Sequence, residues 1–238
     1  MGDSNFENVK AWHCFFEQSG TFKNEFKRLG LAAFDYDILD DYGQTDFQID
    51  IFAEIEKAFE GGQSAFDKMG EGDAIFAFFP CVRFSKLFIW HMNQTAKQCA
   101  KYDLKKKMEN FLELQGELDK FAKLITKLVL VSIEKSLPLV IENPYSADHY
   151  LVRYWPAVPS IIDSNRRLMG DWYEKPTQYF FFNCQPLDNL IFDEPLAYHD
   201  PRKVLDERQK QKSMISPDYA RRFIRSYLKP YSEKDAII

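Results

Sequence analysis

The chain has 238 residues, of which 45% are hydrophobic and 28% are charged. This composition suits one folded domain with a small appendage and argues against disorder. The formal net charge of −5 gives no protein-wide attraction to nucleic acid, so any contact with a polyanion has to be local. No apolar run approaches the roughly 20 residues that span a bilayer. The polar, acidic stretch 1–7 is not typical of a signal peptide. We therefore expect a cytoplasmic protein with no membrane partner.

The four cysteines, Cys14, Cys81, Cys99 and Cys184, are far apart in the sequence. They show no paired spacing of the kind that holds zinc, so no metal site is expected. A cytoplasmic location implies that the thiols are reduced. Cys14 lies within an apolar run and is expected to be a small core residue.

The first third of the chain alternates between strand and helix patterns. The apolar run 11–16 predicts a buried strand, and Ser19-Gly20-Thr21 predicts a turn and a helix cap. Phe22, Phe26 and Leu29 follow at helical spacing, and Gly30 is placed to close that helix. The next strand, 31–36, ends in acidic residues. A strand–turn–helix–strand–acid unit is typical of nucleotide-type α/β folds.

The middle of the chain continues the alternation. A helix is expected from Ile51, with Asp50 near its start and Gly61-Gly62 at its end. A strand over 73–79 precedes a helix over 86–98. Apolar residues then recur at three- and four-residue steps over 104–128, which predicts a long helix that Gly116 would kink. A further buried strand follows over 137–141.

The last third is rich in Pro and aromatic residues. It holds another strand over 178–182, and Ser216-Pro217 is expected to cap a final helix that runs to Leu228. Strands that alternate with helices predict an α/β fold with a three-layer, mainly parallel, Rossmann-like sheet. We place the main unit at 1–165. Residues 166–238 form a small appendage whose last helix returns to the core.

Two strand ends carry the residues with the most chemical promise. The stretch Phe79-Pro80-Cys81-Val82-Arg83-Phe84-Ser85 follows the strand over 73–79, and Glu142-Asn143-Pro144 follows the strand over 137–141. In open α/β sheets, ligands bind outside the carboxyl ends of the strands. A nucleophile and an acid at two such ends would face one ligand.

These stretches resemble the motifs of cytosine C5 DNA methyltransferases, in a short form suggestive of phage or mobile-element genes. In that family the nucleophile lies in a Pro-Cys-Gln-x-x-Ser motif. The stretch 80–85 keeps its Pro, Cys and Ser, with Val82 in place of Gln. The stretch 142–144 matches the Glu-Asn-Val motif, with Pro for Val. The resemblance implies a methyltransferase core over 1–165 and a reduced target-recognition region over 166–238.

The family's cofactor motifs have weaker counterparts in the same order along 11–143. The glycine motif Asp-x-Phe-x-Gly-x-Gly corresponds to Phe16–Gly20, which retains the Phe and one Gly. A Glu-apolar-Asp motif resembles Asp35-Tyr36-Asp37, and Asp-Ile resembles Asp50-Ile51. The resemblance implies S-adenosylmethionine as cofactor. Its implied contacts are Phe16, Glu17, Ser19, Gly20, Thr21, Asp35, Tyr36, Asp50 and Pro80.

The chemistry of the family gives each residue a role. A Cys81 thiolate would attack C6 of cytosine, which makes the ring able to take a methyl group at C5. Glu142 would donate to ring N3, with Asn143 beside it. The family's Gln-x-Arg-x-Arg motif implies Arg167 as a further catalytic residue. Asp35 would bind the ribose hydroxyls, Tyr36 would pack on adenine, and Asp50 would accept from its amine. The target base would be flipped out of double-stranded DNA.

Plainer structural roles remain open for the same residues. Cys81 would also suit a buried thiol, and Glu142-Asn143 would suit a cap of the following helix or turn. Asp35 would suit the end of a strand, Tyr36 a position in the core, and Asp50 the N-cap of a helix. Because Arg166 and Arg167 are adjacent, they would point to opposite faces of a strand, so at most one can serve.

Two other functions also stay open. One is a catalytically silent relative that binds DNA or a partner protein, and the other is an RNA methyltransferase. The region between the Arg pair and the Ser216 helix is short for target recognition. Specificity for a DNA sequence is therefore expected to be low, to be absent, or to come from a second chain.

Overall fold

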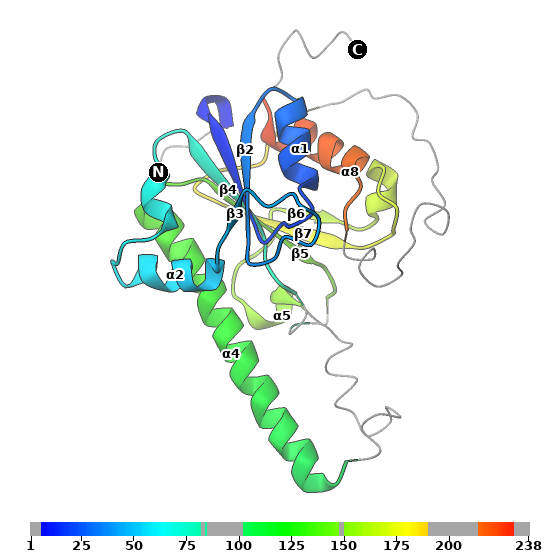
Figure 1. The fold of residues 1–238 in the computed structure, drawn as a ribbon. Helices are drawn as coiled ribbons and strands as arrows, with labels where there is room; N and C mark the ends of the chain where they lie inside the picture. The colour runs from blue at the N-terminus through cyan, green and yellow to red at the C-terminus, as the bar shows by residue number, and fades with distance from the viewer. Residues whose placement is uncertain (1–5, 82–83, 85–101, 148–149, 190–213, 231–238) are drawn as a thin grey trace.

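The computed structural model describes residues 6–81, 84, 102–147, 150–189 and 214–230. Within them lies one seven-stranded sheet in the order β3-β2-β1-β4-β5-β7-β6 (Figure 1). The first five strands of this order run parallel, and β7 runs antiparallel to both of its neighbours. The strands are β1 (Ala11–Phe15), β2 (Ala32–Asp37), β3 (Phe47–Gln48), β4 (Asp73–Phe78), β5 (Leu139–Pro144), β6 (Ile161–Asp163) and β7 (Thr177–Phe182).

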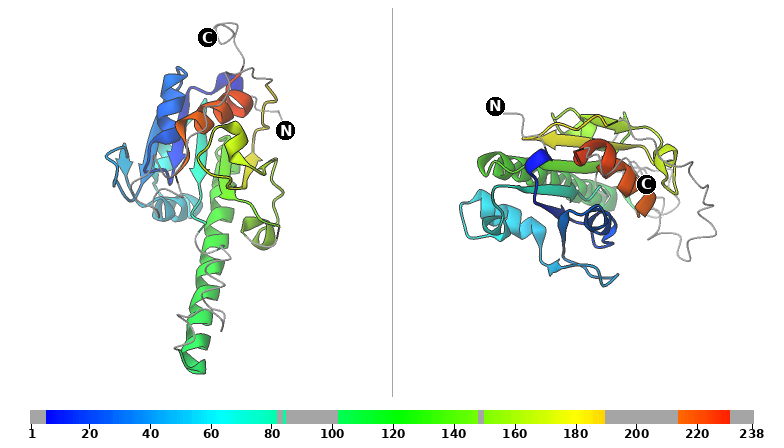
Figure 2. Two further views of the ribbon diagram at one scale, coloured as in Figure 1. Left: turned by 90° about the vertical axis from the view of Figure 1, so that its right-hand side faces the viewer. Right: turned by 90° about the horizontal axis from the view of Figure 1, so that it is seen from above.

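Helices cover both faces of the sheet (Figures 1 and 2). One face carries α1 (Thr21–Arg28) and α8 (Pro217–Phe223), which pack against each other, and α8 continues as a π-helical turn, Ile224–Leu228. The other face carries α2 (Ile51–Phe59) and α4 (Leu104–Glu134), also in mutual contact. The N-terminal half of α4 extends well beyond the sheet (Figure 1). Shorter helices are η1 (Phe6–Asn8), η2 (Ala65–Lys68), α5 (Leu151–Tyr154) and η5 (Arg166–Met169).

Each face of the sheet has its own apolar cluster, because successive side chains of a strand point to opposite faces. The α2/α4 side buries Phe15, Ile75, Ile55 and Ile125. The α1/α8 side is dominated by aromatic rings, with Phe22 and Phe223 both against Phe76. The high Phe content therefore fills the core.

The structure confirms the expected three-layer, mainly parallel α/β fold. The short strands β3 and β6 carry no pattern that predicted them. β7 enters the sheet between β5 and β6, so residues after 165 contribute to the same sheet. The helix expected over 86–98 lies outside the described residues. No helix of the described part is both long and apolar enough to cross a membrane.

Candidate active site

The carboxyl ends of β4 and β5 bring Cys81 and Glu142 to the same edge of the sheet. Glu142 pairs in register with Phe78, the last residue of β4, and Cys81 follows three residues later. The Asn143 side chain joins the two strand ends, because its Nδ2 donates to the Phe79 carbonyl oxygen at 3.0 Å. Asn143 is fully buried. Its amide therefore fixes the start of the Pro80-Cys81 loop beside Glu142.

The Cys81 thiol is partly exposed and lies in a charged environment. Burial raises its pKa, the Lys175 ammonium opposes that rise, and the Glu142 carboxyl adds to it. A raised pKa favours the thiol over the nucleophilic thiolate at neutral pH. Cys81 would thus become reactive where a positive charge offsets its desolvation.

Glu142 is almost fully buried, with 7% of its surface exposed. Burial raises its pKa, against the effect of the Lys175 and Arg166 cations. Its Oε1 lies 3.8 Å from Arg166 Nη1 and has no hydrogen-bond partner among the described residues. A carboxyl whose pKa is raised by burial retains its proton more readily, which suits a general acid.

The structure brings Arg166, and not Arg167, to Glu142. Both arginines lie on the 3-10 helix η5, in place of the strand that was considered for them. The Arg166 side chain is fully buried, forms an ion pair with Asp171, and donates to Thr177 Oγ1 at 3.4 Å. Arg167 is partly exposed and pairs with Glu174 at 3.2 Å. The ion pair to Glu142 is thus made by Arg166, and the catalytic role expected of Arg167 remains a prediction.

Tyr150 is a site residue that no sequence motif indicated. Its ring is partly buried, and burial together with the Cys81 and Glu142 charges raises the pKa of its hydroxyl. Its backbone has φ 60° and ψ −161°, an unfavourable conformation for an aromatic residue. The Tyr150 N–H donates to the Phe84 carbonyl oxygen at 3.1 Å, which connects it to the segment after Cys81.

The loop after β1 has the tight turn expected of a cofactor loop. Phe16 and Gly20 both have positive φ, at 61° and 67°. The Phe16 ring contacts the rings of Phe52, on α2, and Phe79, which follows β4, so it lies between α2 and the end of β4. A Cβ on Gly20 would come within 3.0 Å of Gln44. Gly20 is therefore required both by its conformation and by the close approach of the segment after β2.

Polar groups of the same loop are directed at the N-terminus of α1. Glu17 Oε1 accepts from the Phe22 N–H at 2.8 Å and from Ser19 Oγ at 3.2 Å. Ser19 Oγ and Thr21 Oγ1 lie 3.0 Å apart. Glu17 is buried, and desolvation raises its pKa to about 7. Glu17, Ser19 and Thr21 thus form the start of α1, and their contact with a cofactor remains a prediction.

Asp35 and Tyr36 are adjacent in β2, so their side chains lie on opposite faces of the sheet. Asp35 is fully buried under α1, where its Oδ2 lies 3.5 Å from Lys23 Nζ. Tyr36 faces the α2/α4 side, where its ring stacks on Phe47 and its hydroxyl lies 2.9 Å from His13 Nδ1. The plainer roles weighed for both residues, strand and core, therefore fit this geometry better than direct contact with a cofactor.

The residues that do reach the edge at β2 are Asp37 and Ile38. Asp37 ends the strand, is partly exposed, and accepts from the Leu39 N–H at 2.8 Å. Ile38 is 57% exposed. The sequence already contained Asp37 as the second acid of the Asp35-Tyr36-Asp37 motif. The extent of β2 in the structure was needed to choose between Asp35 and Asp37 as the acid at the end of the strand.

Asp50 and Pro80 complete the set of residues at neighbouring strand ends. Asp50 is exposed and is the N-cap of α2, where its Oδ1 accepts from the Phe52 and Ala53 N–H groups at 3.0 and 3.3 Å. Pro80 is partly buried and directly precedes Cys81. Ligand atoms above this edge would meet the loops after β3, β2, β1 and β4 in turn.

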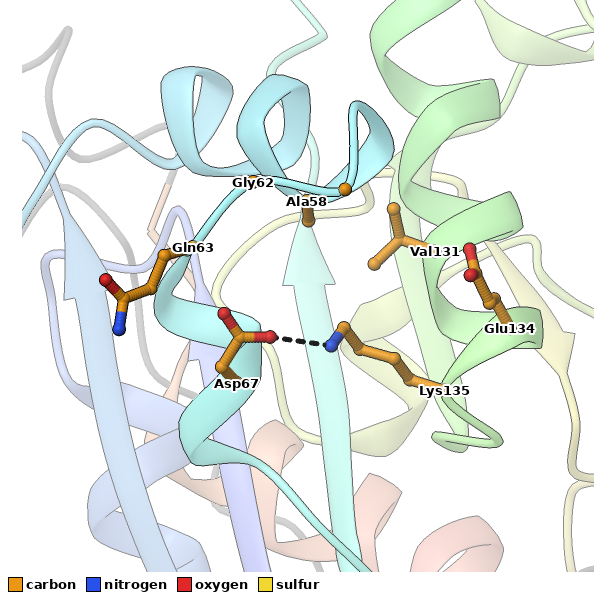
Figure 3. Close-up of a pocket in the computed structure, with 8 residues that line it drawn as sticks. Ala58, Gly62, Gln63, Asp67, Val131, Glu134 and Lys135 are labelled. Atoms are coloured by element: carbon orange, nitrogen blue, oxygen red, sulfur yellow. Dashed lines mark hydrogen bonds and ion pairs between the residues drawn. The ribbon is translucent and has the colours of Figure 1, made fainter.

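Two other features of the described residues lie apart from this edge. A shallow hollow between the ends of α2 and α4, lined by Ala58, Val131 and the Asp67–Lys135 ion pair, lies at the amino ends of β4 and β5 (Figure 3). Cys14, Glu17 and Asp35 bring potential metal ligands within 4.8 Å of one another. However, the Lys23 ammonium already lies against Asp35, and burial raises the pKa of the Cys14 thiol, so a metal ion is not favoured there.

A scan against protein-family models finds no match to this chain, and a search of the curated proteins finds no relative. Its function is therefore inferred from the residues and from the geometry of the site.

Proposed function

We propose that this protein is an S-adenosylmethionine-dependent methyltransferase that methylates C5 of cytosine in DNA. The observation that carries the proposal is the meeting of Cys81 and Glu142 at the carboxyl ends of adjacent parallel strands, joined by the Asn143 hydrogen bond. The Glu142 carboxyl contributes to the raised pKa of the Cys81 thiol. The mainly parallel sheet also fits the Rossmann-like fold expected of such an enzyme.

The proposed reaction begins with addition of the Cys81 thiolate to C6 of the ring. A carbon–sulfur bond forms, the C5–C6 electron pair shifts into the ring, and the Glu142 proton passes to N3. This makes C5 nucleophilic. After C5 has gained a methyl group, a water molecule accepts the C5 proton, the carbon–sulfur bond breaks to release the thiolate, and the N3 proton returns to the Glu142 carboxylate, which restores the aromatic ring. Cytosine within a duplex cannot reach such a site, so it would be flipped out.

S-adenosylmethionine would supply an electrophilic methyl group to C5. The cofactor would be held by residues at the ends of four neighbouring strands. They are Phe16 and Gly20 after β1, Asp37 and Ile38 at the end of β2, Asp50 after β3, and Pro80 after β4. Their chemistry fits a nucleoside. Phe16 and Ile38 offer apolar surface to an adenine, and Asp37 and Asp50 offer carboxylate oxygens to hydroxyl or amine donors. The Gly20 turn would allow close backbone approach.

The test of the proposal is covalent trapping on DNA that contains 5-fluorocytosine. Fluorine at C5 cannot leave as a proton does, so the enzyme stays bonded to C6 after methyl transfer. We expect wild-type protein with S-adenosylmethionine to form an adduct that survives denaturing electrophoresis, and Cys81→Ala to form none. An absence of adduct from folded wild type, on DNA pools of varied sequence with cofactor present, would refute the proposed reaction.

One observation favours a second candidate, a silent relative that binds DNA or a partner protein. Gln44 packs against Gly20, and its Oε1 accepts from Asn24 Nδ2 at 3.1 Å, so the segment after β2 covers part of the glycine turn. Isothermal titration separates the two functions. Binding of S-adenosylmethionine supports the methyltransferase. Salt-dependent DNA binding with no heat from millimolar cofactor would support the silent relative.

A further inference from the structure

The loop that leads into β7 brings a lysine to the ends of β4 and β5. Thr177, the first residue of β7, pairs with Pro144, and the Tyr145 N–H donates to the Pro176 carbonyl oxygen at 2.9 Å. The backbone of Lys175 therefore lies at the same edge of the sheet as Glu142. Pro176 fixes one backbone dihedral of this turn, and Thr177 Oγ1 donates to the Lys175 carbonyl oxygen at 3.1 Å.

The Lys175 ammonium acts on both proposed reacting groups. It is the strongest cationic influence on the Cys81 thiol and on the Glu142 carboxyl. Arg166, the other cation near Glu142, is fully buried and is held by Asp171. Lys175 is partly exposed, and no ion pair ties it to another described residue.

We propose that Lys175 is the catalytic cation of this site: it stabilises the Cys81 thiolate when this forms and, after the attack, stabilises the Glu142 carboxylate. The inference rests on the proposed function. When sulfur bonds to C6 and the Glu142 proton passes to N3, one negative charge leaves the sulfur and one appears on the carboxylate. The total charge is unchanged. A cation that acts on both groups stabilises this charge before and after the transfer, which a cation beside only one of them would not do.

The groups around Cys81 have opposing effects on its thiolate, and a test has to separate the effect of Lys175 from the others. Desolvation of the thiol and the Glu142 carboxyl disfavour the thiolate, whereas Lys175 and a backbone hydrogen bond favour it. Removal of an opposite charge at close range changes a pKa by about one to three units. Replacement of Lys175 by a neutral side chain should therefore raise the pKa of Cys81, and replacement by arginine should largely preserve it.

The experiment measures the rate of iodoacetamide alkylation at Cys81 against pH, by mass spectrometry of the peptide that carries this residue. We expect Lys175→Gln to lower the rate at pH 7.5 by about tenfold or more and to move the profile to higher pH by about one unit. Lys175→Arg should restore most of the rate. Lys135→Gln is the matched control, because Lys135 pairs with Asp67 at the opposite edge of the sheet. Unfolding midpoints would verify that all variants are folded.

An alkylation profile that does not change in folded Lys175→Gln would overturn the role of Lys175. The 5-fluorocytosine adduct is measured in parallel and should form more slowly in Lys175→Gln, with partial rescue in Lys175→Arg. If wild type forms no adduct while the alkylation profile still depends on Lys175, the proposed methyltransferase reaction fails, but the electrostatic link between Lys175 and Cys81 stands. The two failures are therefore distinguishable.

Discussion

Replacement of Asp35 by Asn should change how the stability of the protein depends on pH. Asp35 is fully buried, and its two oxygens have no hydrogen-bond partner among the described residues. Lys23 lies 3.5 Å from it but also 3.2 Å from Asp46, which is partly exposed. Desolvation, aided by the nearby Glu17 carboxyl, outweighs Lys23 and raises the pKa of Asp35 from 3.8 to about 8. The folded protein therefore keeps a proton on Asp35 at neutral pH.

The sign of the effect follows from proton linkage. Between pH 4 and about 8 the unfolded chain has lost the Asp35 proton and the folded chain has kept it, so the unfolding free energy falls as pH rises. The slope is about 1.4 kcal/mol per pH unit for one proton. Asn imitates the protonated carboxyl and removes this term. Between pH 5 and pH 7 the stability of Asp35→Asn relative to wild type should therefore rise by about 3 kcal/mol.

The assay is urea unfolding at pH 5, 6, 7 and 8, followed by tryptophan fluorescence. Trp12 is buried and stacks on Phe26, which makes its emission sensitive to unfolding. Asp41→Asn is the control, because Asp41 is an exposed carboxylate. A stability difference that stays constant with pH, or that falls as pH rises, would refute the reasoning. A constant difference would mean that Asp35 is ionised in both the folded and the unfolded chain over this pH range, as expected if the ion pair with Lys23 outweighed desolvation.

Three further outcomes are expected. Ser216→Ala should lower the unfolding free energy by about 1–2 kcal/mol in urea titrations, because Ser216 Oγ accepts from the Tyr219 N–H at the start of α8 and donates to the Gly170 carbonyl oxygen. Phe76→Ala should cost about 3–5 kcal/mol in the same assay, since Phe76 is fully buried between Phe22 and Phe223. Asp37→Asn should weaken S-adenosylmethionine binding about tenfold in isothermal titration, by loss of charged hydrogen bonds; unchanged affinity would remove Asp37 from the proposed cofactor site.

The order of helices and strands could be predicted because local patterns determine it. Phe22, Phe26 and Leu29 mark one face of α1, and uninterrupted apolar runs mark the central strands. The edge strands β3 and β6 have two and three residues, too few to show any periodicity. The position of β7 depends on pairing with β5, a contact between residues far apart in the chain, which no local pattern contains.

The candidate site divides in the same way. Cys81 and Glu142 could be chosen because a strand pattern precedes each of them, and parallel strands place their carboxyl ends together. The cofactor contact expected of Asp35 remains a prediction. Asp35 and Asp37 are two residues apart and lie on the same side of β2, but Asp35 is buried within the strand, whereas Asp37 ends it and is partly exposed. Lys175 and Tyr150 were not placed in the site because antiparallel pairing and an unusual backbone conformation bring them there.

The appendage expected after residue 165 supports the reacting groups through one connected set of contacts. Arg166 links Glu142 to Asp171, and Asp171 Oδ1 accepts from the Ser216 N–H at 3.0 Å, at the cap of α8. In the same region, Thr177 and Pro176 hold the Lys175 turn against the end of β5. The acid and the proposed cation thus depend on β7, η5 and α8, whereas the nucleophile depends on β4. Because the antiparallel strand β7 joins these parts, a chain that ended before Thr177 would retain Cys81, Glu142 and Lys175 but lose the strand that holds the Lys175 turn at the end of β5.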